Sequence, residues 1–82
     1  MSVHEKLQKI FRTVFDKDDL VISDDMSAKD IPDWDSLAQI NLVVAAEGEF
    51  GVRFLTAEIR SLKNVGEFER LIQAKLASGA GP

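Results

Sequence analysis

The chain has 82 residues, of which 45% are hydrophobic and 29% charged, so it predicts one small globular domain rather than a disordered segment. It contains no cysteine, which excludes a disulfide framework and a thiolate metal site. No apolar run in the sequence approaches the roughly 18 residues that a membrane span needs. We therefore expect a cytoplasmic protein without membrane insertion.

The net charge of −4 is unevenly distributed along the chain. Every aspartate lies between Asp16 and Asp35, where only Lys17 and Lys29 oppose them. Such a negative field repels nucleic acid and attracts partners that carry Lys or Arg patches. Aspartate is also common in solvated turns, so an ordinary loop explains the composition equally well. We predict no nucleic-acid partner and leave both interpretations of the acidic segment open.

A first helix is predicted over residues 3 to 15, followed by a long loop. Ser2 and Glu5 form a capping-box pattern before the helix. Its apolar residues recur at helical spacing: Val3, Leu7, Ile10, Phe11, Val14 and Phe15. Residues 16 to 35 hold no sustained period, and Pro32 disfavours helix before it. The loop has five candidate apolar anchors: Leu20, Val21, Ile22, Met26 and Ile31. Loops of this length are uncommon in compact domains and usually functional. A mere connection between two helices that point the same way explains the length equally well.

A second helix is predicted from Ser36 to about Phe50, with Gly51 ending it. We expect the Ser36 hydroxyl to cap this helix and Gln39 to return the bond. At about 100° per residue, the apolar residues form two arcs. The arc predicted to face the core comprises Leu42, Val43, Ala46 and Phe50. The other forms a second apolar stripe and comprises Leu37, Ile40 and Val44. We predict that the stripe is exposed and docks into a partner's groove; a helix buried all round is the alternative.

Two further helices complete the predicted fold. Thr56 is the expected cap of a short helix over residues 57 to 62. Asn64, with Glu67, is the expected cap of the last helix. The apolar stripe of that helix is Val65, Phe68, Leu71, Ile72 and Leu76. Residues 78 to 82 are predicted to be a disordered tail after a domain of residues 1 to 77. The fold class is all-α: a small antiparallel four-helix bundle with a long loop between the first two helices. The predicted core is Phe11, Leu42, Phe50, Phe68 and Leu71.

The sequence lacks the usual catalytic and metal-binding patterns. His4 is the only histidine and has no cysteine or nucleophilic serine near it in the chain. The acidic loop does not follow EF-hand spacing, because Leu20 or Leu37 would fall at a ligand position. No glycine-rich phosphate loop is present. We therefore predict neither a metal site nor an enzyme.

Three short segments carry a resemblance to a known family. They are Asp35-Ser36-Leu37 after the loop, Glu47-Gly48-Glu49-Phe50-Gly51 at the end of the second helix, and Val65-Gly66-Glu67 at the start of the fourth. Over residues 3 to 77 the chain resembles the acyl carrier protein family. The resemblance implies that Ser36, flanked by Asp35 and Leu37, is esterified with 4'-phosphopantetheine taken from coenzyme A by a phosphopantetheinyl transferase. The thiol of that arm would carry acyl groups as thioesters, which explains why the chain needs no cysteine.

The resemblance also implies partner contacts on the second helix. Asp35, Glu47 and Glu49 match carboxylates that family members offer to basic patches. Carriers of fatty acid synthesis commonly have Asp or Glu where this chain has Ala38, Asn41 and Gly48. Positive charge is added near the third helix by Arg53, Arg60 and Lys63. We therefore expect recognition to depend on the stripe of Leu37, Ile40 and Val44 and on Trp34.

This departure indicates a monomeric carrier dedicated to a specialised pathway. Its partners would be acyltransferases, ketosynthases or acyl-ligases of fatty acid, lipid or polyketide-type biosynthesis. One alternative is an aminoacyl or peptidyl carrier, although such carriers typically place Gly-Gly and a hydrophobic residue around the serine, unlike Asp33-Trp34-Asp35-Ser36. A second is a helical adaptor without a prosthetic group, in which Ser36 would serve only as a cap.

Overall fold

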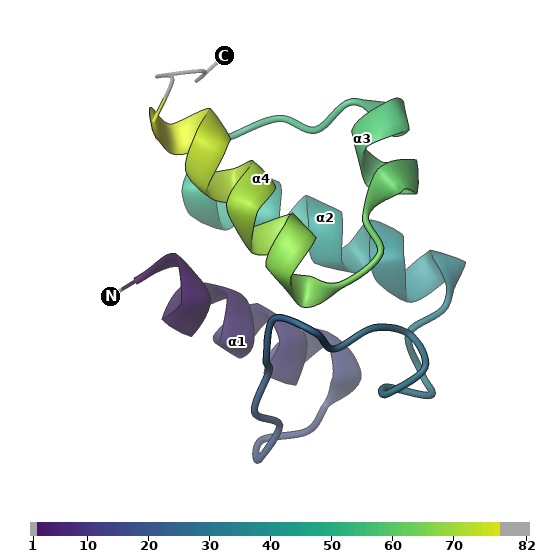
Figure 1. Ribbon diagram of the computed structural model, residues 1–82. Helices are drawn as coiled ribbons and strands as arrows, with labels where there is room; N and C mark the ends of the chain where they lie inside the picture. Colours follow the sequence, from purple (N-terminus) through teal and green to yellow (C-terminus); the bar gives the residue numbers. More distant parts are fainter. Residues whose placement is uncertain (1, 78–82) are drawn as a thin grey trace.

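The computed structural model describes residues 2–77, which form four helices and, within that range, no strand. They are α1 (Val3–Phe15), α2 (Ser36–Phe50), α3 (Thr56–Ser61) and α4 (Val65–Ala77). α1 packs against both α2 and α4. In Figure 1, α4 lies in front of α2. The predicted all-α bundle with a long first loop and a short α3 is confirmed. The predicted disorder of residues 78–82 lies outside the described residues. None of the helices within residues 2–77 has the length and apolar character to cross a membrane.

The helix starts follow the predicted caps at α1 and α4 and differ from them at α2 and α3. Ser2 Oγ accepts the N–H of Glu5 at 3.1 Å, as the capping pattern before α1 predicts. Asn64 Oδ1 likewise accepts the N–H of Glu67 at 2.8 Å before α4. The predicted Thr56 cap is wrong, because Thr56 is already the first residue of α3. The start of α3 is instead held by the Glu58 carboxylate, which accepts the N–H of Leu55 at 2.8 Å.

The core is formed by one face of α1, α2 and α4 together with residues of the loops. Its fully buried large side chains include Leu7, Phe11, Leu42, Val65, Phe68 and Ile72. Three of the five predicted core residues belong to this set. Phe50 and Leu71 are only partly buried and pack at the edge of the core. Phe50 is the last residue of α2, where the Lys6 ammonium group lies 5.9 Å from the centre of its ring.

The loop of residues 16–35 is fixed at several points. Ile22 and Ile31 are buried as predicted, whereas Val21 is 67% exposed, so its predicted role as an anchor is wrong. Neighbouring side chains in extended backbone point to opposite sides, and here Ile22 takes the inward side. The carbonyl oxygens of Asp24 and Met26 accept the first N–H groups of α4, at 2.8 and 2.9 Å. The loop therefore caps α4 with its own backbone.

Candidate functional site

Ser36 is the first residue of α2 and is exposed where the long loop ends. Two buried residues of the loop, Ile31 and Trp34, precede it. The backbone N–H of Trp34 donates to the Ile31 carbonyl oxygen at 3.0 Å. The Trp34 ring meets the Phe11 ring edge-on, with the centroids 5.3 Å apart. The chain thus leaves the core at Trp34, and Ser36 is held at the surface two residues later.

The cap of α2 is Asp35 and not Ser36, so that prediction is wrong. The backbone of Asp35 is extended, and its Oδ1 accepts the N–H of Ala38 at 2.9 Å. Aspartate caps helices as well as serine does, and its charge also favours the positive end of the helix dipole. Within residues 2–77 the Ser36 hydroxyl has no hydrogen-bond partner. The structure leaves this hydroxyl free for chemistry.

Gln39 does not return a capping bond either. Its Oε1 accepts a hydrogen bond from Trp34 Nε1 at 2.6 Å, and its Nε2 donates to the carbonyl oxygen of Ile59 at 3.4 Å. Gln39 therefore links the end of the loop, α2 and α3. No sequence pattern predicts this bridge, because Ile59 is 20 residues away and lies on another helix.

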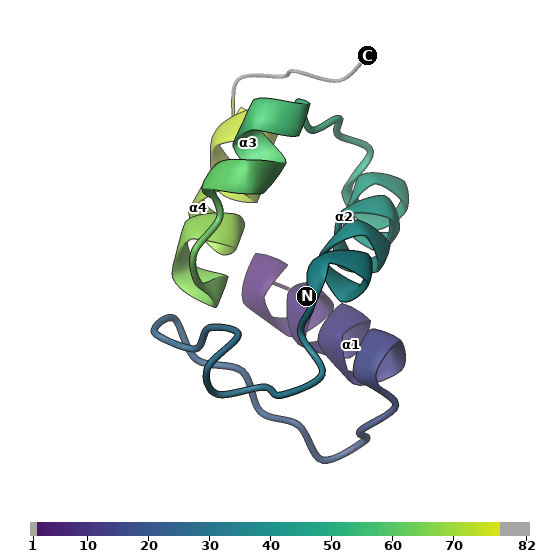
Figure 2. The same ribbon diagram turned by 90° about the vertical axis from the view of Figure 1, so that its right-hand side faces the viewer.

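A groove of about 780 Å³ runs between α2 and α3, and we call it the α2–α3 groove. Ser36, Gln39 and Ile40 line it on the α2 side, while Arg60 and Lys63 bring two cationic side chains to the opposite side. Figure 2 shows α3 lying across from α2. A group attached to Ser36 would therefore meet an apolar and cationic groove at the start of a helix.

The stripe of Leu37, Ile40 and Val44, which we call the α2 stripe, is exposed as predicted. The exposed fractions of Leu37, Ile40 and Val44 are 67%, 54% and 61%. The opposite face of α2 is buried through Ala38, Leu42, Val43 and Ala46. The alternative of a helix buried all round is excluded by these exposures, and the binding of a partner to the stripe stays a prediction.

Two other predicted partner contacts have internal roles. Trp34 is only 9% exposed and uses its indole N–H within the chain, so we revise its role from a surface contact to a support of the site. Glu47 Oε2 accepts the backbone N–H of Phe54 at 2.9 Å, which fixes the segment between α2 and α3. Asp35 likewise uses one carboxylate oxygen for the cap of α2.

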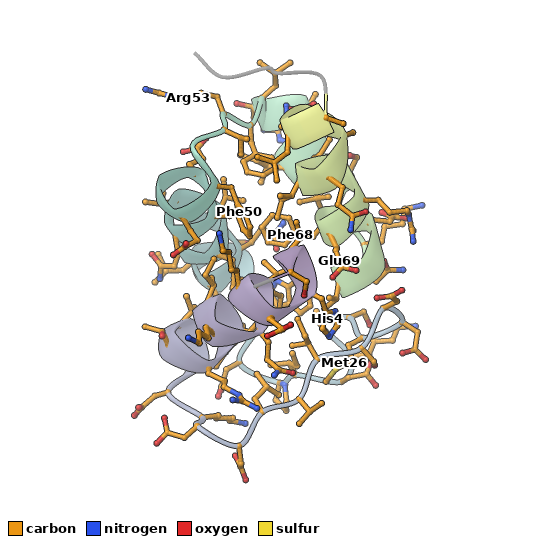
Figure 3. All side chains as sticks on the ribbon, turned by 90° about the vertical axis from the view of Figure 1, so that its left-hand side faces the viewer. His4, Met26, Phe50, Arg53, Phe68 and Glu69 are labelled. Atoms are coloured by element: carbon orange, nitrogen blue, oxygen red, sulfur yellow. The ribbon has the colours of Figure 1, made fainter. Side chains whose placement is uncertain are left out.

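His4 lies apart from the α2–α3 groove. Its Nδ1 is 2.9 Å from Glu69 Oε1, so it connects the first turn of α1 to α4, and Figure 3 shows the two side chains beside each other. Asp24 adds a second carboxylate, and potential ligand atoms of the three residues lie within 4.8 Å of one another. None of the three lines the α2–α3 groove. The one histidine of the chain therefore does not belong to the site around Ser36.

Comparison with known proteins agrees with this site. No family model matches the chain. It is 44% identical over 46 residues to an acyl carrier protein of Acidothermus cellulolyticus, which covers 56% of this chain and 55% of that protein. It is 32% identical over 72 residues to polyketide-8 synthase acyl carrier protein 2 of Streptomyces avermitilis, covering 88% of this chain and 83% of the relative.

A solved structure extends the likeness to three dimensions. The solution NMR structure of holo acyl carrier protein from Geobacter metallireducens has a TM-score of 0.87 and 42% identity, and covers 96% of this chain and 91% of that one. The sequence identity, the shared helical fold and the exposed Ser36 at the start of α2 lead to one conclusion: the chain belongs to the acyl carrier protein family.

Proposed function

We propose that the chain carries acyl groups as thioesters on a 4'-phosphopantetheine arm attached to Ser36. The observation that carries this proposal is the free, exposed hydroxyl of Ser36 beside the α2–α3 groove. When bound, the arm supplies a terminal thiol, which the chain itself lacks. The chain would act by position alone, since a tethered intermediate reaches partner active sites at high effective concentration.

The residues around Ser36 fit a phosphodiester. The N-terminal end of α2 favours negative charge, because its first N–H groups and the helix dipole point toward that end. Arg60 and Lys63 offer cationic groups across the groove. No histidine lies at the site, and the Asp35 carboxylate is engaged in the cap of α2, so we assign removal of the Ser36 hydroxyl proton to a phosphopantetheinyl transferase.

The pathway is proposed from sequence differences and from one relative. The polyketide relative is a carrier of a specialised synthase by its name. Asn41 and Gly48 leave the outer face of α2 with few carboxylates, whereas Ala38 lies on its buried face. We propose a monomeric carrier in the cytoplasm that serves acyltransferases, ketosynthases or acyl-ligases of a specialised acyl product.

Intact mass spectrometry tests the attachment. The chain is coexpressed with a broad-specificity phosphopantetheinyl transferase, and we expect one added arm. Ser36→Ala should lose the added mass entirely, whereas Ser61→Ala, a matched change on α3, should keep it. A parent chain that stays unmodified would favour the adaptor interpretation, and a Ser36→Ala chain that still gains the arm would place the attachment elsewhere.

A further inference from the structure

Gln39 joins the two walls of the α2–α3 groove. Its amide accepts a hydrogen bond from the Trp34 indole at 2.6 Å and donates one to the Ile59 carbonyl oxygen at 3.4 Å. All three residues line the groove, Trp34 and Gln39 on the α2 side and Ile59 on the α3 side. Gln39 is also three residues from Ser36, so both lie on the same face of α2. A polar bridge thus crosses the groove about one helical turn from Ser36.

The bridge imposes a condition on any chain that enters between the walls. A saturated acyl chain would have to displace the Gln39 amide, which leaves the Trp34 indole N–H without a partner, whereas the Ile59 carbonyl oxygen keeps the backbone N–H of Leu62 at 3.4 Å. The cost of leaving the N–H of a buried indole unpaired is comparable to the gain from burying a few methylenes. A chain with a keto or hydroxyl oxygen can take over part of the hydrogen bonding, so it avoids much of this cost.

We propose that Gln39 is a specificity-determining residue that keeps saturated acyl chains out of the α2–α3 groove and admits chains carrying a hydrogen-bonding oxygen. The inference rests on the proposed attachment of the arm to Ser36. Without the bridge, the apolar side chains of Ile40, Ile59 and Leu62 would accept any acyl chain of suitable length. With it, the preferred cargo is an oxygenated acyl group.

The indole N–H of Trp34 provides a direct readout, because the chain has one tryptophan. The apo protein is loaded by a broad-specificity transferase with hexanoyl- or 3-oxohexanoyl-coenzyme A, and intact mass confirms each product. In ¹⁵N NMR spectra of the parent we expect the indole resonance to move with the 3-oxohexanoyl cargo and to stay at its holo position with the hexanoyl cargo. In Gln39→Leu we expect the hexanoyl cargo to move the indole resonance as well, and to raise the Tm of the loaded variant.

Gln73→Leu makes the same chemical change on the exposed face of α4, and it should behave as the parent does. If Gln39→Leu does not fold, Gln39→Met and the comparison of the two cargoes in the parent still decide. If the indole resonance of the loaded parent responds equally to both cargoes, or to neither, the proposed role of Gln39 is overturned, while the proposed function is not. A parent that takes no arm overturns the proposed function, and this inference with it.

Discussion

At the scale of single residues, the start of α2 divides two tasks between neighbours. Asp35 satisfies the helix end by accepting the Ala38 N–H at 2.9 Å, while the Ser36 hydroxyl remains without a partner. A hydroxyl engaged in capping would have to give up that bond before it could be modified. Because the carboxylate caps instead, modification of Ser36 costs the helix no capping bond. The carboxylate of Glu47 also has a structural role, since it accepts the backbone N–H of Phe54.

Capping by Asp35 leads to a stability prediction. Asp35→Ala should lower the free energy of unfolding by about 1 kcal/mol, the usual cost of a lost N-cap. Ser36→Ala removes no capping bond and should lower it by less than about 0.5 kcal/mol. Urea denaturation followed by circular dichroism measures both, with Asp35→Asn as a control that keeps a capping oxygen. Equal losses for Asp35→Ala and Ser36→Ala would contradict the assignment of the cap.

At the scale of elements, one carboxylate fixes the start of the short helix α3 and links it to α4. Glu58 accepts the Leu55 N–H at 2.8 Å and contacts the Lys75 ammonium group of α4 at 2.9 Å. These contacts, first the backbone hydrogen bond and then the lysine, lower the pKa of Glu58, and burial opposes them. Since α3 has no buried side chain, this carboxylate is a main link between α3 and α4.

The lowered pKa of Glu58 fixes the sign of a pH effect. A depressed pKa means that the folded state favours the carboxylate, so the stabilisation is present above the ordinary value of 4.5 and is lost as the pH falls through the folded pKa. Glu58→Gln should therefore destabilise the protein near neutral pH, and its difference from the parent should shrink in acid. Urea denaturation across a pH series checks this.

Glu49→Gln is the matched control for the charge change. Glu49 only approaches Lys6 at 4.0 Å on the surface, and such pairs contribute little. A Glu58→Gln penalty that is the same at neutral and acidic pH would show that the charge of Glu58 does not stabilise α3.

The exposed face of α2 gives a second prediction at this scale. Ile40→Ala should sharply weaken acyl transfer to the cognate partner while Ser36 is still modified, because the substitution removes apolar surface that the partner would bury. Raising the salt concentration should weaken transfer only modestly. Salt screens interactions between exposed charges, with a Debye length of about 8 Å at physiological ionic strength, but has little effect on the burial of apolar surface. Transfer rates of Ile40→Ala and of Val21→Ala, an exposed apolar residue off the stripe, provide the comparison. Collapse of transfer with salt, together with normal transfer by Ile40→Ala, would indicate charge-steered recognition.

At the scale of the whole molecule, the long loop and α4 are joined by backbone hydrogen bonds and by a common core. The N–H groups of Val65 and Gly66 donate to loop carbonyl oxygens, and Ile22 and Ile31 enter the common core. The contact is close: a Cβ on Gly66 would lie 2.9 Å from the Asp24 carbonyl oxygen. The loop that ends at Ser36 is thus positioned by the far helix of the bundle.

A pair of glycine substitutions tests this contact. Gly66→Ala should destabilise the fold, because the Asp24 backbone must shift to make room for the new methyl group. Gly48→Ala, in the last turn of α2 with nothing within 4 Å, should instead stabilise it by up to about 0.5–1 kcal/mol through the helix propensity of alanine. Thermal denaturation of the two variants gives the comparison. A tolerated Gly66→Ala would mean that the loop docks less closely than the structure shows.

The sequence by itself determined the helices, because helical periodicity and capping are local signals, and the family resemblance carried by Asp35-Ser36-Leu37 indicated the candidate serine. The apolar spacing in α1 and α2, Ser2 before α1, Asn64 before α4 and the Asp35-Ser36-Leu37 segment can all be identified from neighbours in the chain. The two faces of α2 followed from the same periodicity, and the exposure of Leu37, Ile40 and Val44 confirms them.

Only the tertiary structure decided which residue does which task at the site. Asp35 and Ser36 are both good caps, so local preference could not choose between them. The burial of Trp34 depends on Phe11 of α1, and the Gln39 bridge depends on Ile59 of α3. The loop is fixed by carbonyl oxygens that reach α4, which leave no mark on side-chain patterns. These contacts join residues far apart in the chain, and packing, which acts between distant segments, is what selects them.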